Sequence, residues 1–245
     1  MKKTIFSSYV KIKKEDFDEK ERKEKDGKEL IFMEQFKALR AKFEYQADMH
    51  KYKVVAVTSA VAEEGKTLTS ANLAANLASV GRKKVLLVDT DMRKSDIAPM
   101  FNAPLKPGLK EFLTGSASLE NIILSSNSAK GFSLISGGGR GTVPSDLLAG
   151  ETFRSFLQEM RSKYDIVLLD TPPILPVADT LSMRDQVDGF ILIFRIGFTP
   201  YVMLQQALEE IEKNKIIGVV LNGVELQKYK YYQRYYGEYY HKKSE

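Results

Sequence analysis

The 245-residue sequence contains no cysteine, which excludes disulfide bonds and thiolate chemistry and agrees with a reducing cytoplasm. No apolar run reaches the roughly 18 residues that a membrane-spanning helix requires. Residues 1–6 lack the extended apolar segment of a secretory signal. The net charge of +5 is too small to argue for a nucleic-acid partner, and we expect none. The chain is long enough for one large α/β domain with extensions.

Residues 59–67 (SAVAEEGKT) are the most informative stretch. They follow the mostly apolar residues 53–57 (KVVAV) and precede residues 68–80, which favour a helix. A strand, a loop and a helix in this order direct backbone N–H groups and the positive end of the helix dipole to one point, where a phosphate can bind. This order favours a P-loop over a surface turn in front of an amphipathic helix. Ala60 occupies the position of the usual first glycine, and alanine resists the left-handed backbone angles that glycine tolerates.

A P-loop at this position gives specific roles to its residues. The Lys66 ammonium would reach the β- and γ-phosphates of ATP, and the Thr67 hydroxyl would bind Mg²⁺. The expected ligands are therefore ATP and Mg²⁺. The phosphate oxygens would be held by six consecutive backbone N–H groups, those of Glu63, Glu64, Gly65, Lys66, Thr67 and Leu68.

Two more apolar runs end in aspartates. Residues 84–88 lead into Asp89 and Asp91, and residues 164–169 lead into Asp170. In an open α/β sheet, ligands bind at the edge formed by the carboxyl ends of the parallel strands. One of these carboxylates could hold Mg²⁺ and another could accept a proton, and Asp170 has the Walker B form expected on the magnesium side. Each aspartate alone could equally be a helix cap or a turn residue.

Strand-like and helix-like segments alternate along the rest of the chain. This order predicts an α/β fold with a doubly wound, mostly parallel sheet and helices on both faces. Gly137, Gly138 and Gly139 are interpreted as a flexible turn, because no Lys-Thr or Lys-Ser pair follows them. The expected strands are residues 132–135, 189–195 and 216–221, and the expected helical segments are residues 30–45, 108–115, 119–123, 144–148, 151–163 and 200–213.

The two ends of the chain differ from its centre. Residues 11–29 carry mixed charges and few apolar side chains, which is typical of a mobile segment or a solvated helix. At the other end, seven of the twelve tyrosines lie among basic residues with few apolar partners. These rings would suit stacking on single-stranded nucleic acid, and their hydroxyls would suit modification. The seven are Tyr229, Tyr231, Tyr232, Tyr235, Tyr236, Tyr239 and Tyr240.

Together these motifs resemble the bacterial tyrosine kinases, or BY-kinases, which regulate capsule and exopolysaccharide synthesis. The resemblance rests on the P-loop at residues 60–67, the Walker A′ segment 85–93 with its trailing arginine, the Walker B segment ending at residues 170–173, and the terminal tyrosines. It divides the chain into three parts. These are a mobile charged segment (1–29), a P-loop kinase domain (30–224) and a tyrosine-rich tail (225–245).

The resemblance implies a Mg-ATP-dependent protein-tyrosine kinase that phosphorylates the tail tyrosines between subunits of a homo-oligomeric ring. Its implied partners are a membrane activator of the polysaccharide co-polymerase type, a cognate tyrosine phosphatase and other protein substrates. The expected localisation is cytoplasmic, peripheral to the inner face of the membrane through the activator. Glu34, Lys37 and Arg40 resemble the family's oligomerisation motif of one glutamate and two arginines. Lys37 replaces the first arginine and lacks its bidentate fork.

The resemblance also implies roles within the active site. Lys66 would stabilise the transferring phosphoryl group, and Thr67, Asp89 and Asp170 are the candidate metal ligands. Asp89 would orient or deprotonate the tyrosine hydroxyl with Asp91 supporting the metal shell, or the two would exchange roles. Asn222, at the end of the last expected strand, would contact the adenine.

Two alternatives share these motifs. A nucleotide-switch ATPase of the partition and division-site type has the same fold, but it carries a second lysine early in the P-loop, where this chain has Val61. An RNA-binding ATPase is the more distant alternative. A eukaryotic-type kinase is excluded because the chain has no His-Arg-Asp or Asp-Phe-Gly triplet.

Overall fold

The computed structural model describes residues 19–126, 131–139 and 146–224, with only the backbone described for residues 19–30. The seven predicted acceptor tyrosines, the rest of the tail and residues 1–18 lie outside the described residues. Within the described ranges, no helix is both long and apolar enough to cross a membrane.

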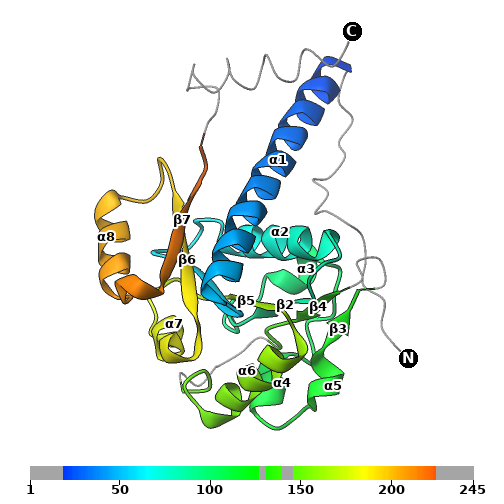
Figure 1. The fold of residues 1–245 in the computed structure, drawn as a ribbon, viewed down its shortest axis with the longest axis vertical. Helices are drawn as coiled ribbons and strands as arrows, with labels where there is room; N and C mark the ends of the chain where they lie inside the picture. The colour runs from blue at the N-terminus through cyan, green and yellow to red at the C-terminus, as the bar shows by residue number, and fades with distance from the viewer. Residues whose placement is uncertain (1–18, 127–130, 140–145, 225–245) are drawn as a thin grey trace.

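The core is one seven-stranded sheet in the order β3-β4-β2-β5-β1-β6-β7 (Figure 1). Every neighbouring pair is parallel except β3 and β4, which are antiparallel. This confirms the predicted mostly parallel sheet. The strands are β1 (Val54–Ser59), β2 (Val85–Asp89), β3 (Leu124–Ser125), β4 (Phe132–Ile135), β5 (Ile166–Asp170), β6 (Gly189–Arg195) and β7 (Ile216–Asn222).

Helices cover both faces of this sheet (Figure 1). In β1, Val55 and Val57 pack under α1, α2 and α3, whereas Val54 and Ala56 pack under α4, α5, α6 and α8. Successive side chains of a strand point to opposite faces, so a strand covered on both faces must be apolar throughout. The helices are α1 (Glu19–His50), α2 (Lys66–Ser79), α3 (Ile97–Met100), α4 (Leu109–Leu113), α5 (Leu119–Ile122), α6 (Glu151–Lys163), α7 (Asp179–Ser182) and α8 (Tyr201–Glu209), with 3₁₀ turns at Arg184–Gln186 and Lys213–Lys215.

The first helix is longer than the sequence predicts. The expected helix covered residues 30–45, whereas α1 runs from Glu19 to His50 and extends well beyond the body of the domain (Figure 1). The helical part of that interpretation is therefore correct for residues 19–29, where glutamate and lysine are good helix formers. Phe43 and Ala47 anchor the C-terminal part of α1 in the core against α2. The helix ends at His50, and the next residue, Lys51, has a left-handed φ of 60°.

Two local predictions are wrong. Residues 146–149 form a turn rather than the start of a helix. The triple-glycine segment is not a flexible turn, because residues 136–139 are buried. The Glu111 carboxylate accepts hydrogen bonds from the N–H groups of Gly108 (2.9 Å) and Gly139 (3.0 Å). A Cβ at Gly137 would press against the Ser95 side chain, and a Cβ at Gly138 would press against Lys110 and Glu111 of α4. The glycines therefore allow the loop after β4 to pack closely against both.

Candidate active site

The loop between β1 and α2 has the geometry of a phosphate-binding loop. Gly65 precedes α2 with φ 91°, and a Cβ there would overlap the side-chain amide of Asn222, so position 65 requires glycine for two reasons. The first N–H groups of α2, including that of Leu68, have no acceptor within the helix and are available to an anion. The other left-handed residue of the loop is Glu63 (φ 65°), not Ala60. Alanine at the usual glycine position therefore causes no strain here.

The Glu64 side chain is fully buried and holds this loop to the sheet. One carboxylate oxygen accepts the N–H of Val61 at 2.9 Å. The other accepts the Thr199 hydroxyl at 2.6 Å and the N–H of Arg195 at 3.1 Å. Glu64 thus fixes the loop against the end of β6. A buried carboxylate is tolerated here because each oxygen is hydrogen-bonded.

Lys66 lies in a cavity of about 300 Å³ at the carboxyl edge of the sheet. Its Nζ is 3.2 Å from an Asp91 oxygen, and both side chains are largely buried. Thr67 and Asp91 line the same cavity. The structure therefore brings three predicted site residues to one cavity. They are the phosphate-binding Lys66, the metal ligand Thr67 and Asp91, one of the two candidate bases.

Asp170 is completely buried beside the start of α2. Burial raises its pKa to about 6, although Lys66 and hydrogen bonds from Thr67 and Ser70 oppose the rise. The Ser70 hydroxyl donates to Asp170 at 3.0 Å. Asp170 therefore sits next to the proposed magnesium ligand Thr67, as the Walker B interpretation requires.

Asp89 is enclosed rather than facing the cavity. One oxygen accepts the Ser95 hydroxyl at 2.6 Å, and the other accepts the N–H of Asp91 at 3.1 Å. Burial and the neighbouring Asp170 charge raise the pKa of Asp89 well above its usual value, and the Ser95 hydrogen bond opposes this. Asp89 does not line the cavity, whereas Asp91 does.

The residues around Thr67 fit a magnesium ion. Three carboxylates, Asp89, Asp91 and Asp170, interact electrostatically. Lys66 pairs with Asp91 and also acts on the charge of Asp170. The Thr67 hydroxyl and the Asp170 carboxylate are the hard oxygen donors that Mg²⁺ prefers, and substrate phosphates and water usually complete its shell. Within the described ranges, no group of three or more histidine, cysteine, aspartate or glutamate side chains is arranged to hold a metal ion by itself.

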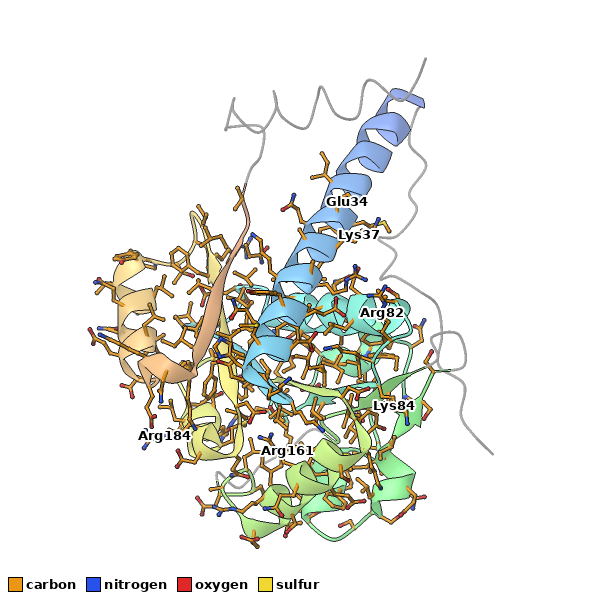
Figure 2. The ribbon with its side chains drawn as sticks, in the orientation of Figure 1. Glu34, Lys37, Arg82, Lys84, Arg161 and Arg184 are labelled. Atoms are coloured by element: carbon orange, nitrogen blue, oxygen red, sulfur yellow. The ribbon has the colours of Figure 1, made fainter. Side chains whose placement is uncertain are left out.

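The remaining predicted site residues lie at two other places. The Asn222 side chain donates to the carbonyl of Glu64 at 2.7 Å, so it contacts the phosphate loop from β7. Glu34 and Lys37 lie on the part of α1 that extends beyond α2, where they form an ion pair of 2.6 Å (Figure 2). Arg40 lies 3.7 Å from Glu44, and its Nε has no hydrogen-bond partner in the described part of the chain.

Several side chains that support the site were not predicted from the sequence. Ser70 follows Lys66 by four residues, a helical spacing that could have indicated its position beside Asp170. Arg93 donates two hydrogen bonds to Asp179, at 2.8 and 3.3 Å, across 86 residues of sequence. No local sequence pattern predicts the Arg93–Asp179 pair or the contact between Glu64 and Thr199.

The fold and the loop geometry define a P-loop nucleotide-binding protein, and residues 52–215 match the family model described as an AAA domain. Within that class, the chain belongs to the bacterial tyrosine kinases. It is 35% identical over 206 residues to the tyrosine-protein kinase YwqD of Bacillus subtilis, covering 83% of this chain and 86% of that protein. The tyrosine-protein kinase ptk of Acinetobacter johnsonii is 32% identical over 197 residues, which are 80% of this chain and 27% of that longer protein.

Solved structures agree with this assignment. The kinase domain of the Escherichia coli tyrosine kinase ETK superposes with a TM-score of 0.72 at 30% identity, covering 78% of this chain and 75% of that one. The septum site-determining protein MinD from Pyrococcus horikoshii, solved with Mg-ADP, reaches a TM-score of 0.54 at 19% identity and covers 69% of this chain and 68% of that one. That second likeness shows the fold alone. Val61 fits the kinase assignment, because its side chain packs against the core instead of extending as a lysine would.

Proposed function

We propose that this kinase transfers the γ-phosphoryl group of Mg-ATP to tyrosines of its own tail, from one subunit to the next. The observation that carries the proposal is the gathering of Lys66, Thr67 and Asp91 around one cavity, with Asp170 behind it. Phosphoryl transfer depends on positioning and charge neutralisation more than on covalent chemistry, and this site offers both.

Each residue then has a role. Lys66 stabilises the charge of the transferring group. Thr67 and Asp170 hold Mg²⁺, which when bound neutralises phosphate charge. Asp91 is placed to orient or deprotonate the incoming hydroxyl, since it lines the cavity. Asp89 then takes the supporting position, which is the exchange of roles that the sequence left open.

In the wider setting, the kinase would regulate capsule or exopolysaccharide synthesis and export. It would work at the inner face of the membrane with an activator of the polysaccharide co-polymerase type, and a cognate tyrosine phosphatase would reverse its action. The similarity of this chain to the tyrosine-protein kinase CpsD and to the relative EpsB supports this setting. Asn222 would contact the adenine, and Glu34, Lys37 and Arg40 would form the contact between subunits.

Mass spectrometry of the full chain after incubation with Mg-ATP tests the proposal. We expect phosphotyrosine within residues 229–240, and none on the Lys66→Met variant. ATP hydrolysis with no phosphotyrosine would instead support a nucleotide-switch ATPase. Hydrolysis that requires added RNA would support the RNA-binding alternative.

A further inference from the structure

The cavity that holds Lys66 has a second wall which none of the assigned roles uses. Pro172, Pro173, Pro176 and Val177, from the segment between β5 and α7, line it together with residues of the phosphate loop. Pro172 and Pro173 are buried, Val177 is half-buried and Pro176 is exposed. These four residues thus present an apolar surface. The charged residues of the cavity are the largely buried Lys66 and Asp91 at its inner end and the more exposed Arg93, Lys94 and Asp96.

The strand order decides which part of the reaction can reach this wall. The phosphate loop follows β1, which has β5 and β2 on one side and β6 and β7 on the other. Asn222, the proposed adenine contact, is at the end of β7 and touches the phosphate loop from that side. The apolar wall follows β5, and Asp91 follows β2. A nucleotide whose base lies toward β7 therefore leaves the β5 side of the cavity to the acceptor.

We propose that the wall formed by Pro172, Pro173, Pro176 and Val177 is the subsite for the aromatic ring of the acceptor tyrosine. This inference rests on the proposed function, since it names where the acceptor of that transfer binds. A flat apolar ring suits proline and valine surfaces, and it places its hydroxyl toward the charged inner end of the cavity. The phenolic oxygen forms a bond to the γ-phosphorus, the bond from that phosphorus to the bridging oxygen breaks as ADP leaves, and the phenolic proton passes to the Asp91 carboxylate.

Arg93 and Asp179 act as positioning residues for this subsite. Arg93 lines the cavity from the segment after β2, and Asp179 begins α7, directly after the apolar wall. Their two hydrogen bonds, 2.8 and 3.3 Å, join the segment that carries Asp91 to the segment that carries the wall. The Asp179 side chain is only 7% exposed, whereas the Arg93 side chain is 45% exposed, so it is the carboxylate and the two hydrogen bonds that give the pair a defined geometry. It fixes the width of the space into which the ring enters.

The test uses the full chain with its seven tail tyrosines changed to phenylalanine, so that it cannot phosphorylate itself. The acceptor is a synthetic peptide of residues 225–245. Val177→Thr keeps the volume of the wall but adds a hydroxyl, Val177→Leu keeps it apolar, and Arg93→Lys removes the bidentate fork. Arg161→Lys is the matched control, because Arg161 forms a similar two-bond pair with Asp188, 2.9 and 2.8 Å, away from the cavity.

We expect the peptide KM to rise about tenfold in Val177→Thr and in Arg93→Lys, with the Kd for ADP changed by less than about twofold. Val177→Leu and Arg161→Lys should stay within about twofold of the parent in peptide KM. Combining Arg93→Lys with Asp179→Asn should cost no more than the larger single effect, because the two residues form one unit. If Arg93→Lys fails to fold, as judged by its thermal transition, the comparison of Val177→Thr with Val177→Leu still tests the subsite, because Val177 is partly exposed.

Two results would overturn the subsite. One is an unchanged peptide KM in Val177→Thr and Arg93→Lys, and the other is a Kd for ADP that rises as much as the peptide KM, which would place the nucleotide on this wall. Failure of the proposed function looks different, because the parent enzyme would then phosphorylate no peptide at all before any of these substitutions is made.

Discussion

The Glu64 carboxylate accepts a hydrogen bond of 2.6 Å from the Thr199 hydroxyl, 135 residues further along the chain. This contact links the phosphate loop after β1 to the loop after β6. Arg195 adds a second link, since its guanidinium donates to the carbonyl of Glu63 at 3.0 Å. These bonds fix the conformation of the phosphate loop, so less of its backbone has to be ordered when a nucleotide binds.

Loosening this contact should weaken nucleotide binding. Glu64→Gln removes a charged acceptor, and a loss of about 1.5–3 kcal/mol raises the Kd for ADP about 10- to 100-fold. Thr199→Val removes one hydrogen bond and should raise it less, about 2- to 10-fold. Titration calorimetry measures both. The control is Thr180→Val, which loses an equally buried hydroxyl bond, 2.7 Å to the carbonyl of Pro172, but does not touch the phosphate loop. Equal Kd values in all three variants and the wild type would contradict the role of Glu64.

Asp170 should lower the stability of the ligand-free protein while being required for phosphorylation. Burial raises its pKa to about 6. At neutral pH the negative charge of Asp170 therefore costs more free energy in the folded protein than in the unfolded chain. Asp170→Asn removes that charge, and we expect the ligand-free protein to become about 1–3 kcal/mol more stable. The same variant should lose Mg²⁺-dependent phosphorylation. Urea unfolding without ligand and a kinase assay check the two halves. A destabilised, fully active variant would show that Asp170 is a structural residue.

The charge of Asp188, unlike that of Asp170, should stabilise the fold, and this stabilisation should depend on pH. Burial alone would raise its pKa, but the Arg161 guanidinium and the N–H groups of Val54 and Lys53 outweigh burial, so its pKa lies below its usual value. A carboxylate with a lowered pKa adds stability that is present above the unfolded pKa of about 4 and disappears as the pH falls through the folded pKa.

The wild type should therefore exceed Asp188→Asn in unfolding free energy by about 1.5–3 kcal/mol at pH 7, with the difference shrinking below about pH 4. Urea titrations of both proteins across that range measure it. A difference that stays constant with pH would mean that the charge of Asp188 contributes nothing.

Assembly should depend on the charge of the tail. Each phosphate adds about −1.5 to −2, so seven phosphotyrosines add about −10 to −14 to a basic segment. Such tails should repel one another and leave the aspartate-lined sites of neighbouring subunits. We expect unphosphorylated protein to form oligomers, and phosphorylated protein and Arg40→Ala to be smaller in light scattering.

The control for Arg40→Ala is Arg184→Ala. Both arginines lie near a single carboxylate, at 3.7 Å from Glu44 and 3.9 Å from Asp185. Arg184 is far from Glu34 and Lys37 on the molecule (Figure 2). Equal masses for Arg40→Ala and Arg184→Ala would remove α1 from the proposed subunit contact.

The sequence predicted the sheet and the position of several site residues at its carboxyl edge, for a physical reason. Strands covered on both faces must be continuously apolar, and the residues that bind ligands must follow them directly, so Lys66, Asp91 and Asp170 stand out from the pattern alone. What it could not predict depends on distant partners. Arg93 and Asp179, or Glu64 and Thr199, meet only because the strand order brings their loops together. The glycines at 137–139 were misjudged because their close contacts with Ser95 and Glu111 leave no mark in the local sequence.

The Lys66→Met variant provides the decisive measurement. Methionine keeps the length of the side chain and removes its charge, so the variant cannot act as a donor, with a loss of about 10³-fold or more in rate, but its tail can still accept phosphate. Mixed with a partner whose seven tail tyrosines are phenylalanine, which can donate but not accept, it should gain phosphotyrosine on residues 229–240, and only when Mg-ATP and the partner are both present. Phosphotyrosine on Lys66→Met alone at the wild-type rate would remove the P-loop from the mechanism, and no phosphotyrosine in the mixture would rule out transfer between subunits.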